Sequence, residues 1–164
     1  MLKKNNHLLK KIFYNYLKYP NKVIISENNK SLTWKELINC SLYYSLKFSE
    51  IKTKYVPIII NRNLETIIVI LALVLSNKVF CPISSAIPTR KRKIILKLLK
   101  TKHLIDCSKI RVLKEMKEDK KNNSINIKKK LIKNNLIDEF YVLFTSGSTG
   151  DPKGVKLSYE NILN

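Results

Sequence analysis

The chain has 164 residues, with 32 Lys or Arg against 12 Asp or Glu, a formal net charge of +20 and a hydrophobic fraction of 45%. That fraction supports a packed core and argues against wholesale disorder. The longest apolar run, residues 67–75, is far shorter than the roughly 18–20 residues that span a bilayer. The basic N-terminus lacks the unbroken apolar stretch of a secretion signal. We therefore expect a cytoplasmic protein without a membrane span.

The expected elements alternate between strands and helices along most of the chain. They are a basic helix at His7 to Lys18, strands at 22–26 and 31–33, a helix from Thr33 through Phe48, a strand at 55–60, a buried helix at Leu64 to Leu75, a strand at 79–83, a helix near Thr89, strands at 103–107, 111–113, 139–144 and 154–158, and a final helix from Ser158. Strands alternating with helices between Tyr55 and Cys107 predict an α/β fold of βαβ units, with helices on the faces of a parallel sheet.

Composition divides the chain into four segments. These are a basic N-terminal helix (1–21), a βαβ core (22–108), a Lys/Asn-rich surface excursion (109–137), and a glycine-loop hairpin with the start of a helix (138–164).

Local signals mark where three of the helices begin. Thr33 followed by Glu36 forms a capping box, and Leu32 with Leu37 matches the hydrophobic staple that often accompanies one. We expect Asn63 to cap the next helix and Thr89 to cap the one after it. In that last helix the expected inward-facing residues are Ile94, Ile95, Leu98 and Leu99, and those expected to face water are Lys91, Lys93, Lys97 and Lys100.

The excess of positive charge suggests nucleic-acid binding, but the residue types weaken this interpretation. Of the basic residues, 28 are Lys and only four are Arg, whereas phosphate and base recognition favours the Arg fork. The lysines are scattered over every expected element, without interleaved aromatic residues for base stacking. We expect no specific nucleic-acid partner, only general attraction to polyanions. A basic nucleic-acid-binding module, which would bind DNA or RNA in a salt-sensitive way, remains an alternative.

The cysteines and histidines do not indicate a metal site or a catalytic centre. Cys40, Cys81 and Cys107 are odd in number, widely spaced and without a C-x-x-C pair, which argues against a disulfide framework or a zinc site. We expect them to be small buried apolar side chains. His7 and His103 have no acidic or thiol partner at ligand spacing, and we expect each to be a surface or packing residue.

All three glycines of the chain, Gly147, Gly150 and Gly154, fall within eight residues of the stretch YVLFTSGSTGDPKGVKLS. A loop that wraps a polyphosphate turns its backbone N–H groups inward, in conformations that a Cβ atom disfavours. The same stretch contains the hydroxyl side chains of Thr145, Ser146, Ser148 and Thr149 and the ammonium of Lys153. A charge-assisted hydrogen bond to phosphate contributes about 1.5–3 kcal/mol. The pattern predicts an anion-binding loop.

This loop differs from a Walker A sequence, because Lys153 is followed by Gly154 and β-prone residues instead of Ser or Thr and a helix. The expected context is therefore strand–loop–strand. A simple Ser/Gly/Thr turn between two hairpin strands is the alternative, although such a turn needs only one or two glycines and no series of hydroxyls.

The stretch YVLFTSGSTGDPKGVKLSYENIL closely resembles the signature phosphate loop of the adenylate-forming (AMP-dependent synthetase/ligase) superfamily. That superfamily includes acyl-CoA synthetases, nonribosomal peptide synthetase adenylation domains and D-alanine–carrier-protein ligase. Upstream, SLTWKEL resembles the family's early LTY-x-EL stretch, and the segment ending in VFCPISSAIP resembles its strand–helix–strand segment. The resemblance covers most of residues 22–164. It implies the N-terminal portion of such an enzyme, ending just after the phosphate-loop hairpin.

The resemblance implies ATP-dependent activation of a carboxylic acid, either an amino acid or an acyl group, as an acyl-adenylate that passes to the thiol of coenzyme A or a carrier protein. Carried over by position, the ATP phosphate-binding residues are Thr145, Ser146, Gly147, Ser148, Thr149, Gly150 and Lys153. Mg²⁺ is expected to accompany ATP, and no residue of this chain is assigned to it or to catalysis. The family's adenine, ribose and acid sites and its C-terminal domain lie further downstream. A missing C-terminal half or a partner chain is therefore an expected partner.

Three departures from the family pattern stand out. Tyr159 occupies a position where many relatives have His, Asn77 and Lys78 replace a turn that usually contains glycine, and Ser84 replaces a common aspartate. The alternative to an acid-activating enzyme is a catalytically inactive truncated fragment that binds only nucleotide phosphate or polyanions.

Overall fold

A computed structural model describes residues 7–27, 30–111, 137–146 and 152–163. Its elements, in chain order, are α1 (His7–Lys18), β1 (Val23–Glu27), β2 (Lys30–Thr33), α2 (Trp34–Ser49), β3 (Tyr55–Ile60), α3 (Leu64–Leu75), β4 (Val79–Ser84), α4 (Thr89–Leu98), β5 (Ile105–Asp106), β6 (Glu139–Ser146), β7 (Pro152–Ser158) and α7 (Tyr159–Leu163). In the described residues, every helix is too short or too polar to cross a bilayer.

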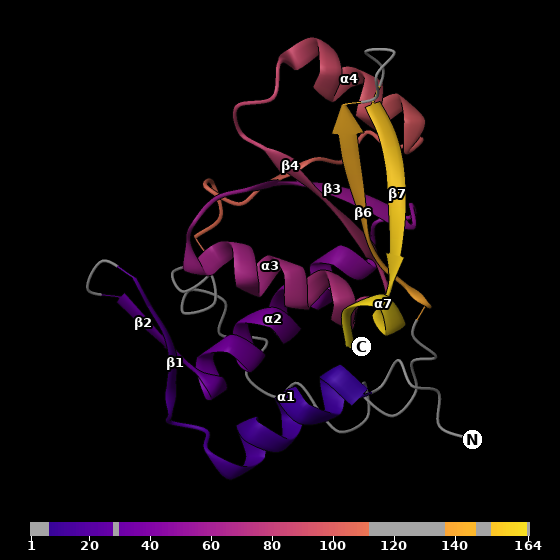
Figure 1. Cartoon of the computed structure of the whole chain (residues 1–164). Coiled ribbons are helices and arrows are strands. Elements are labelled where there is room, and N and C mark those ends of the chain that lie inside the picture. The colour runs from indigo at the N-terminus through magenta and orange to yellow at the C-terminus, as the bar shows by residue number, and fades with distance from the viewer. Residues whose placement is uncertain (1–6, 28–29, 112–136, 147–151, 164) are drawn as a thin grey trace.

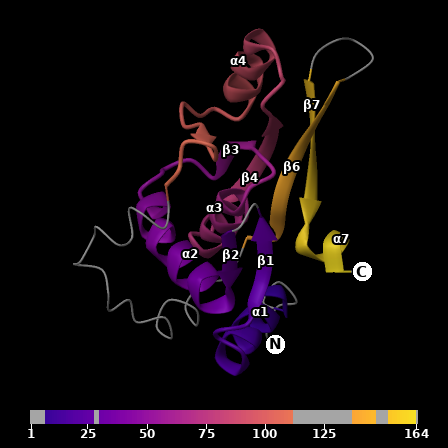
Figure 2. The same ribbon diagram turned by 90° about the vertical axis from the view of Figure 1, so that its left-hand side faces the viewer.

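A five-stranded sheet of order β5-β3-β4-β6-β7 forms the centre of the fold (Figure 1). β3 runs parallel to both β4 and β5, and β4 runs parallel to β6. Only the edge strand β7 runs antiparallel, forming a hairpin with β6. A separate antiparallel pair, β1 and β2, lies beside the helices (Figure 2). The predicted α/β class with parallel βαβ units is confirmed.

Helices cover both faces of the sheet because side chains alternate along each strand. Val56 and Ile58 of β3 belong to the apolar cluster that contains α2 and α3. On the opposite face, Val79, Cys81 and Ile83 of β4 pack with Ile95 of α4 and with Leu99, which directly follows that helix. The apolar core on this second face is the smaller of the two, and α4 is the helix that covers it.

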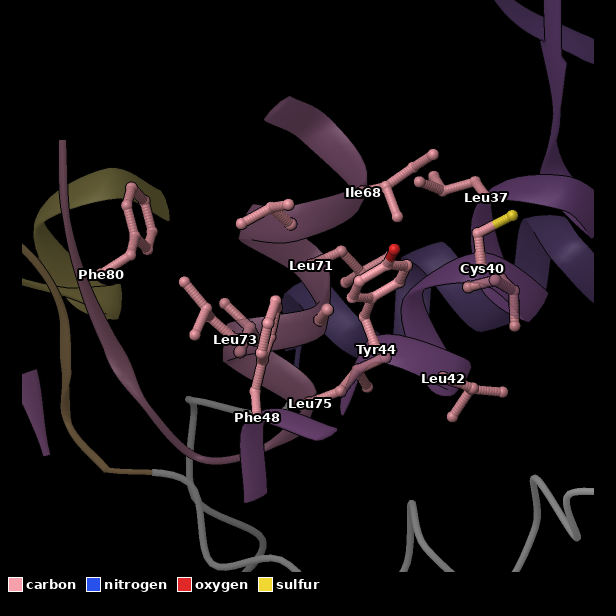
Figure 3. Packing of buried hydrophobic residues seen from close by; sticks show 14 of the residues in the cluster. Leu37, Cys40, Leu42, Tyr44, Phe48, Ile68, Leu71, Leu73, Leu75 and Phe80 are labelled. Carbon is pink, nitrogen blue, oxygen red and sulfur yellow. The ribbon is translucent and has the colours of Figure 1, made fainter. Parts of the chain in front are cut away.

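The main core is the interface between α2 and α3, whose residues interdigitate in Figure 3. α3 is apolar nearly all round, as expected of a buried helix. On α2, the rings of Tyr44 and Phe48 lie 5.6 Å apart between centroids and face this interface. The hydroxyl of the buried Ser41 donates to the carbonyl of Ile68 at 3.3 Å, so this polar group is satisfied inside the core.

The two side-chain caps predicted for α2 and α3 are confirmed. The Thr33 N–H donates to Glu36 Oε2 at 2.8 Å, and the Glu36 N–H donates to Thr33 Oγ1 at 3.2 Å, which is a reciprocal capping box. Asn63 Oδ1 accepts from the Thr66 N–H at 3.1 Å at the start of α3. Each of these bonds satisfies a helix-terminal N–H that has no partner within the helix.

Both α3 and α4 end in a left-handed residue that is not glycine. Asn77 has φ 59° and Lys100 has φ 51°. After α3, the Lys78 N–H donates to the Leu73 carbonyl at 2.9 Å and the Asn77 N–H donates to the Val74 carbonyl at 3.0 Å. These two bonds define a Schellman motif, and an equivalent pair closes α4 around Lys100. Asn77 therefore adopts the left-handed conformation that glycine enters most readily.

Two expectations for α4 are wrong. The position before the helix is occupied by Pro88, with φ −57° and ψ 143°, and no side chain caps this end; Thr89 is the first helical residue. The fixed φ of Pro88 suits an extended residue before a helix and displaces the expected cap by one position. Leu98, expected to face inward, is 55% exposed. The small core beneath α4 covers only the stripe formed by Ile95 and Leu99, which lie one helical turn apart.

The strand expected at 103–107 shortens to Ile105–Asp106, which pairs with Ile58 and Ile59 of β3. It ends where Asp106 Oδ1 accepts from the Ser108 N–H at 3.1 Å, a side-chain turn that competes with strand pairing. Arg111 belongs to no strand, and the rest of the strand expected at 111–113 lies outside the described residues. So does most of the Lys/Asn-rich excursion.

Candidate functional site

The predicted phosphate loop connects β6 to β7, so the expected strand–loop–strand context is confirmed. Thr145 and Ser146 end β6, and they lie opposite Lys153 and Pro152 of β7 in the hairpin register. The pairing brings both ends of the predicted site to one end of the hairpin. The other predicted residues, Gly147, Ser148, Thr149 and Gly150, lie outside the described residues.

This end of the hairpin lies at the carboxyl end of β6, which runs parallel to β4. Ligands of open α/β sheets bind outside the carboxyl ends of the parallel strands. The side chains of Thr145 and Lys153 are exposed there, so a hydroxyl and an ammonium are both accessible to an anion. The position therefore suits phosphate binding both chemically and topologically.

α4 lies beside the same end of the hairpin in both views and contacts β7 (Figures 1 and 2). Its residues Arg90, Lys93 and Lys97 line a shallow hollow of about 530 Å³ together with Thr89 and Ile94. The sequence pattern predicts only that Lys93 and Lys97 face water, and it assigns no role to Arg90. The run RKRK after Pro88 indicates a cluster of cations. That this cluster lies near the hairpin depends on the order of the strands in the sheet, which the run itself does not show. These cations add to a positive field that favours polyanions at this end of the sheet.

Gly154 has a different role from the one suggested by its place in the glycine-rich window. It lies opposite Phe144 in the hairpin. A Cβ at this position would meet Phe144 Cε1 at 3.2 Å and Val142 Cγ1 at 3.3 Å, closer than ordinary van der Waals contact. Glycine is thus favoured here because the Phe144 ring lies against the neighbouring strand, a packing reason independent of phosphate.

The cysteines have no features of catalytic groups. All three are buried and free, as expected. Burial raises the pKa of the thiols of Cys40 and Cys81 to about 12 and that of Cys107 to about 11. The thiolate is the reactive form, so these groups are poor nucleophiles at neutral pH. His7 and His103 are exposed, and the described residues contain no group of three or more metal-ligating side chains.

Tyr159 is a packing residue. It is 4% exposed, and its ring lies 4.7 Å from that of Phe140 between centroids. Burial raises the pKa of the Tyr159 hydroxyl, so this ring does not exchange protons near neutral pH as a histidine would.

A second, apolar hollow of about 630 Å³ lies between α1, β1, α2 and α3, where Ile67 and Ile70 of α3 are incompletely covered. Its lining is mainly aliphatic and aromatic: Leu8, Leu9, Ile12, Asn15, Tyr19, Lys22, Val23, Ile24, Ile25, Trp34, Leu37, Ile67, Ile70, Leu71, Val74 and Phe140. Neither Thr145 nor Lys153, the predicted phosphate-binding residues whose side chains the structure describes, lines it. This hollow is therefore separate from the end of the hairpin that carries these two residues.

The family model described as AMP-binding enzyme matches residues 13–164. The chain belongs to this family. Structures of other members show a similar fold. The AlmE adenylation domain of Vibrio cholerae, solved with glycyl-adenosine-5'-phosphate, superposes with a TM-score of 0.74 at 17% identity, over 98% of this chain and 37% of that one. The NpsA N-terminal subdomain of Klebsiella oxytoca, solved with 3-hydroxyanthranilyl-AMSN, gives 0.71 at 23% identity, over 91% and 39%.

Curated relatives of this chain include a peptide synthetase, a peptide synthase and a carrier protein ligase. Gramicidin S synthase 2 of Brevibacillus brevis is 29% identical over 164 residues, which cover 90% of this chain and 4% of that protein. Nonribosomal peptide synthetase GRA1 of Gibberella zeae is 28% identical over 154 residues, covering 85% and 2%. The D-alanine–D-alanyl carrier protein ligase of Lactococcus lactis is 23% identical over 171 residues, covering 95% and 34%. The chain thus spans about a third or less of these relatives.

Proposed function

We propose that this chain is the phosphate-holding part of an enzyme that activates a carboxylic acid with ATP. The observation that carries the proposal is the β6–β7 hairpin, which presents Thr145 and Lys153 opposite each other beside the carboxyl end of a parallel sheet. Membership of the AMP-binding enzyme family supports this function. So do the ligase and synthetase names of its relatives and the acyl-adenylate in the AlmE structure.

In the proposed reaction, a carboxylate oxygen of the acid attacks the α-phosphorus of ATP. A new carboxyl O–P bond forms, the bond to the β-phosphate oxygen breaks, and pyrophosphate leaves with the electron pair. The Lys153 ammonium and the hydroxyls of the loop would bind the β- and γ-phosphates, with glycine allowing close backbone approach. Their contribution is to position the triphosphate and to stabilise the charge that develops on pyrophosphate.

Mg²⁺ would bind together with ATP, through the phosphate oxygens of the nucleotide, and would keep several of its waters, as this ion usually does. The described residues offer no carboxylate cluster that would bind the ion by itself. After activation, the acyl group would pass to a thiol of coenzyme A or of a carrier protein.

ATP–pyrophosphate exchange tests the proposal, using the protein that carries this chain and a panel of amino acids and fatty acids. We expect acid-dependent exchange, and a loss of about 100-fold or more in Lys153→Ala, a typical effect of removing one group that stabilises developing charge. Gly150→Val should also abolish exchange. Lys35→Ala is the matched control, because Lys35 is an exposed lysine on α2, far from the hairpin in the sequence.

Near wild-type exchange in Lys153→Ala would exclude the loop from the mechanism. If no acid supports exchange but tripolyphosphate binds to the loop, the non-catalytic alternative holds.

We also propose that the apolar hollow contacts further polypeptide of an adenylation enzyme. The compared structures are more than twice as long as the part this chain matches, and Ile67 is 38% exposed in the hollow. Exposed apolar patches of this kind mark contact surfaces or promote aggregation. Ile67→Ser should make the chain alone more soluble, because it removes the exposed apolar part of this side chain. Unchanged solubility would count against this contact.

A further inference from the structure

Glu139, the first residue of β6, joins three strands through its side chain. The Tyr55 hydroxyl donates to Glu139 Oε2 at 2.8 Å, and the Lys54 ammonium lies 2.9 Å from the same oxygen. On the other side, the Lys156 ammonium lies 3.2 Å from Oε1. Since Lys54 precedes β3 directly, Tyr55 begins it and Lys156 belongs to β7, one carboxylate connects the hairpin to the middle of the sheet.

The link matters because only a short ladder of paired positions joins the hairpin to the parallel sheet. In the described part of the chain, β4 and β6 pair at a single register position, Phe80 opposite Tyr141. β7 is an edge strand, and its only neighbour in the sheet is β6. Asn77 Oδ1, which accepts from the Ile137 N–H at 2.9 Å, adds a second connection just before β6. Side chains at the base of the hairpin thus supplement this short backbone ladder.

The polar cluster around Glu139 is internally satisfied. The Lys54 and Lys156 ammonium nitrogens lie 5.3 Å and 5.4 Å from the centroid of the Tyr55 ring, so each also makes a cation–π contact. Burial raises the pKa of Glu139, but hydrogen bonds from Lys54, Tyr55 and Lys156 outweigh this effect and lower it to about 2. The carboxylate therefore stays charged under ordinary conditions.

We propose that Glu139 is a positioning residue that fixes the base of the β6–β7 hairpin and thereby sets where the phosphate loop lies. Its distance from Thr145 excludes direct contact with a ligand bound there, because Thr145 lies six positions further along the strand, or about 20 Å away. The part of this inference that concerns the loop rests on the proposed phosphate-binding function. The connection between Glu139 and the hairpin does not.

The test compares the chain with its Glu139→Gln variant, which keeps the size of the side chain and removes its charge. The control is Asp106→Asn, which removes an aspartate that pairs with Lys109 at 3.9 Å outside the hairpin. Hydrogen exchange followed by mass spectrometry reports opening of each segment. In parallel, calorimetry measures the binding of tripolyphosphate. For Glu139→Gln we expect exchange about 10-fold faster in β6 and β7, unchanged exchange in α2 and α3, and several-fold weaker binding of tripolyphosphate.

Two results would overturn the positioning role: hairpin exchange that does not change, or exchange that accelerates equally in all helices and strands, which would indicate only a general loss of stability. If the wild-type chain does not bind tripolyphosphate, the proposed function fails, while hydrogen exchange still decides whether Glu139 holds the hairpin. Should Glu139→Gln not fold, Lys156→Met removes the link between Glu139 and β7, together with the contact of Lys156 with the Tyr55 ring, and leaves Lys54 and Tyr55 bonded to Glu139. The same hairpin-specific acceleration is then expected, and its absence would overturn the proposal.

Discussion

Replacing Lys100 by glycine should stabilise this protein, because Lys100 ends α4 in the left-handed region at φ 51°. A side chain with a Cβ pays roughly 1–2 kcal/mol for that conformation. Glycine avoids this cost but gains about 0.5–1 kcal/mol of conformational entropy in the unfolded chain, which works against folding. Among the described residues, the exposed Lys100 side chain has no ion-pair partner. The balance is a gain of about 0.5–1 kcal/mol in the free energy of unfolding for Lys100→Gly.

Asn77→Gly is the matched comparison, since Asn77 has a similar backbone at φ 59°. Asn tolerates this region better than Lys does, so less is gained there. Its side chain also accepts from the Ile137 N–H, and losing a hydrogen bond of that kind costs about 0.5–1.5 kcal/mol. We therefore expect Asn77→Gly to be neutral or destabilising.

Urea unfolding monitored by circular dichroism measures both free energies, and thermal unfolding gives a second estimate. For a chain of this size, a gain of about 1 kcal/mol raises the melting temperature by about 2–4 °C. The reasoning is refuted if Lys100→Gly is less stable than the wild type. It is also refuted if Asn77→Gly gains as much as Lys100→Gly, because the side-chain hydrogen bond would then contribute nothing.

Three further predictions follow from packing and charge. Gly154→Val should lower the free energy of unfolding by about 1–3 kcal/mol through overpacking, and Phe144→Ala should restore part of this loss; full stability in the single variant would show that the ring simply moves aside. The pKa of Glu139 is about 2 in the folded protein and 4.5 ordinarily, so its contribution is complete above pH 4.5 and is lost as the pH falls toward 2. Because its lysine partners are 40% and 58% exposed, that contribution is on the order of 1 kcal/mol, and Glu139→Gln should flatten the acid limb of the stability curve; an identical limb would contradict the assignment. The three buried cysteines should react with a thiol reagent only as fast as the chain unfolds, and immediate reaction in the native state would contradict their burial.

Much of the fold could be predicted where local signals agree with one another. The helix at Leu64–Leu75 was predicted to the residue because a capping Asn63 precedes a continuous apolar run. The strand at Tyr55–Ile60 was equally clear, since its apolar residues form a short continuous run without helical periodicity, and polar residues bound this run at both ends. The residues of the loop could be proposed from the sequence because hydroxyls, glycines and a lysine lie close together in the chain, and their role in phosphate binding stays a prediction. In these cases the information is local, and tertiary contacts do not override it.

The rest depends on contacts between distant parts of the chain. The hydrogen bond from Tyr55 to Glu139 joins residues 84 positions apart, so no sequence pattern could indicate it. Leu98 matches the apolar periodicity of α4 but is exposed, because the width of the core beneath a helix is set by the sheet and not by the helix. At Asn77 the sequence contained a signal for the left-handed backbone, because Asn stands where the expected turn would contain glycine. At Lys100 no such signal existed, since lysine rarely adopts the left-handed conformation.

The central claim, that the β6–β7 loop binds the triphosphate, is tested most directly by titrating the ¹⁵N-labelled chain with tripolyphosphate and following each backbone amide by NMR. The account predicts saturable shifts concentrated in residues 145–154, which disappear in Lys153→Ala and persist in Lys35→Ala. Shifts spread over the lysines of α1 and α2 and abolished by moderate salt would contradict it, since they would indicate attraction of a polyanion to the net charge of +20 alone.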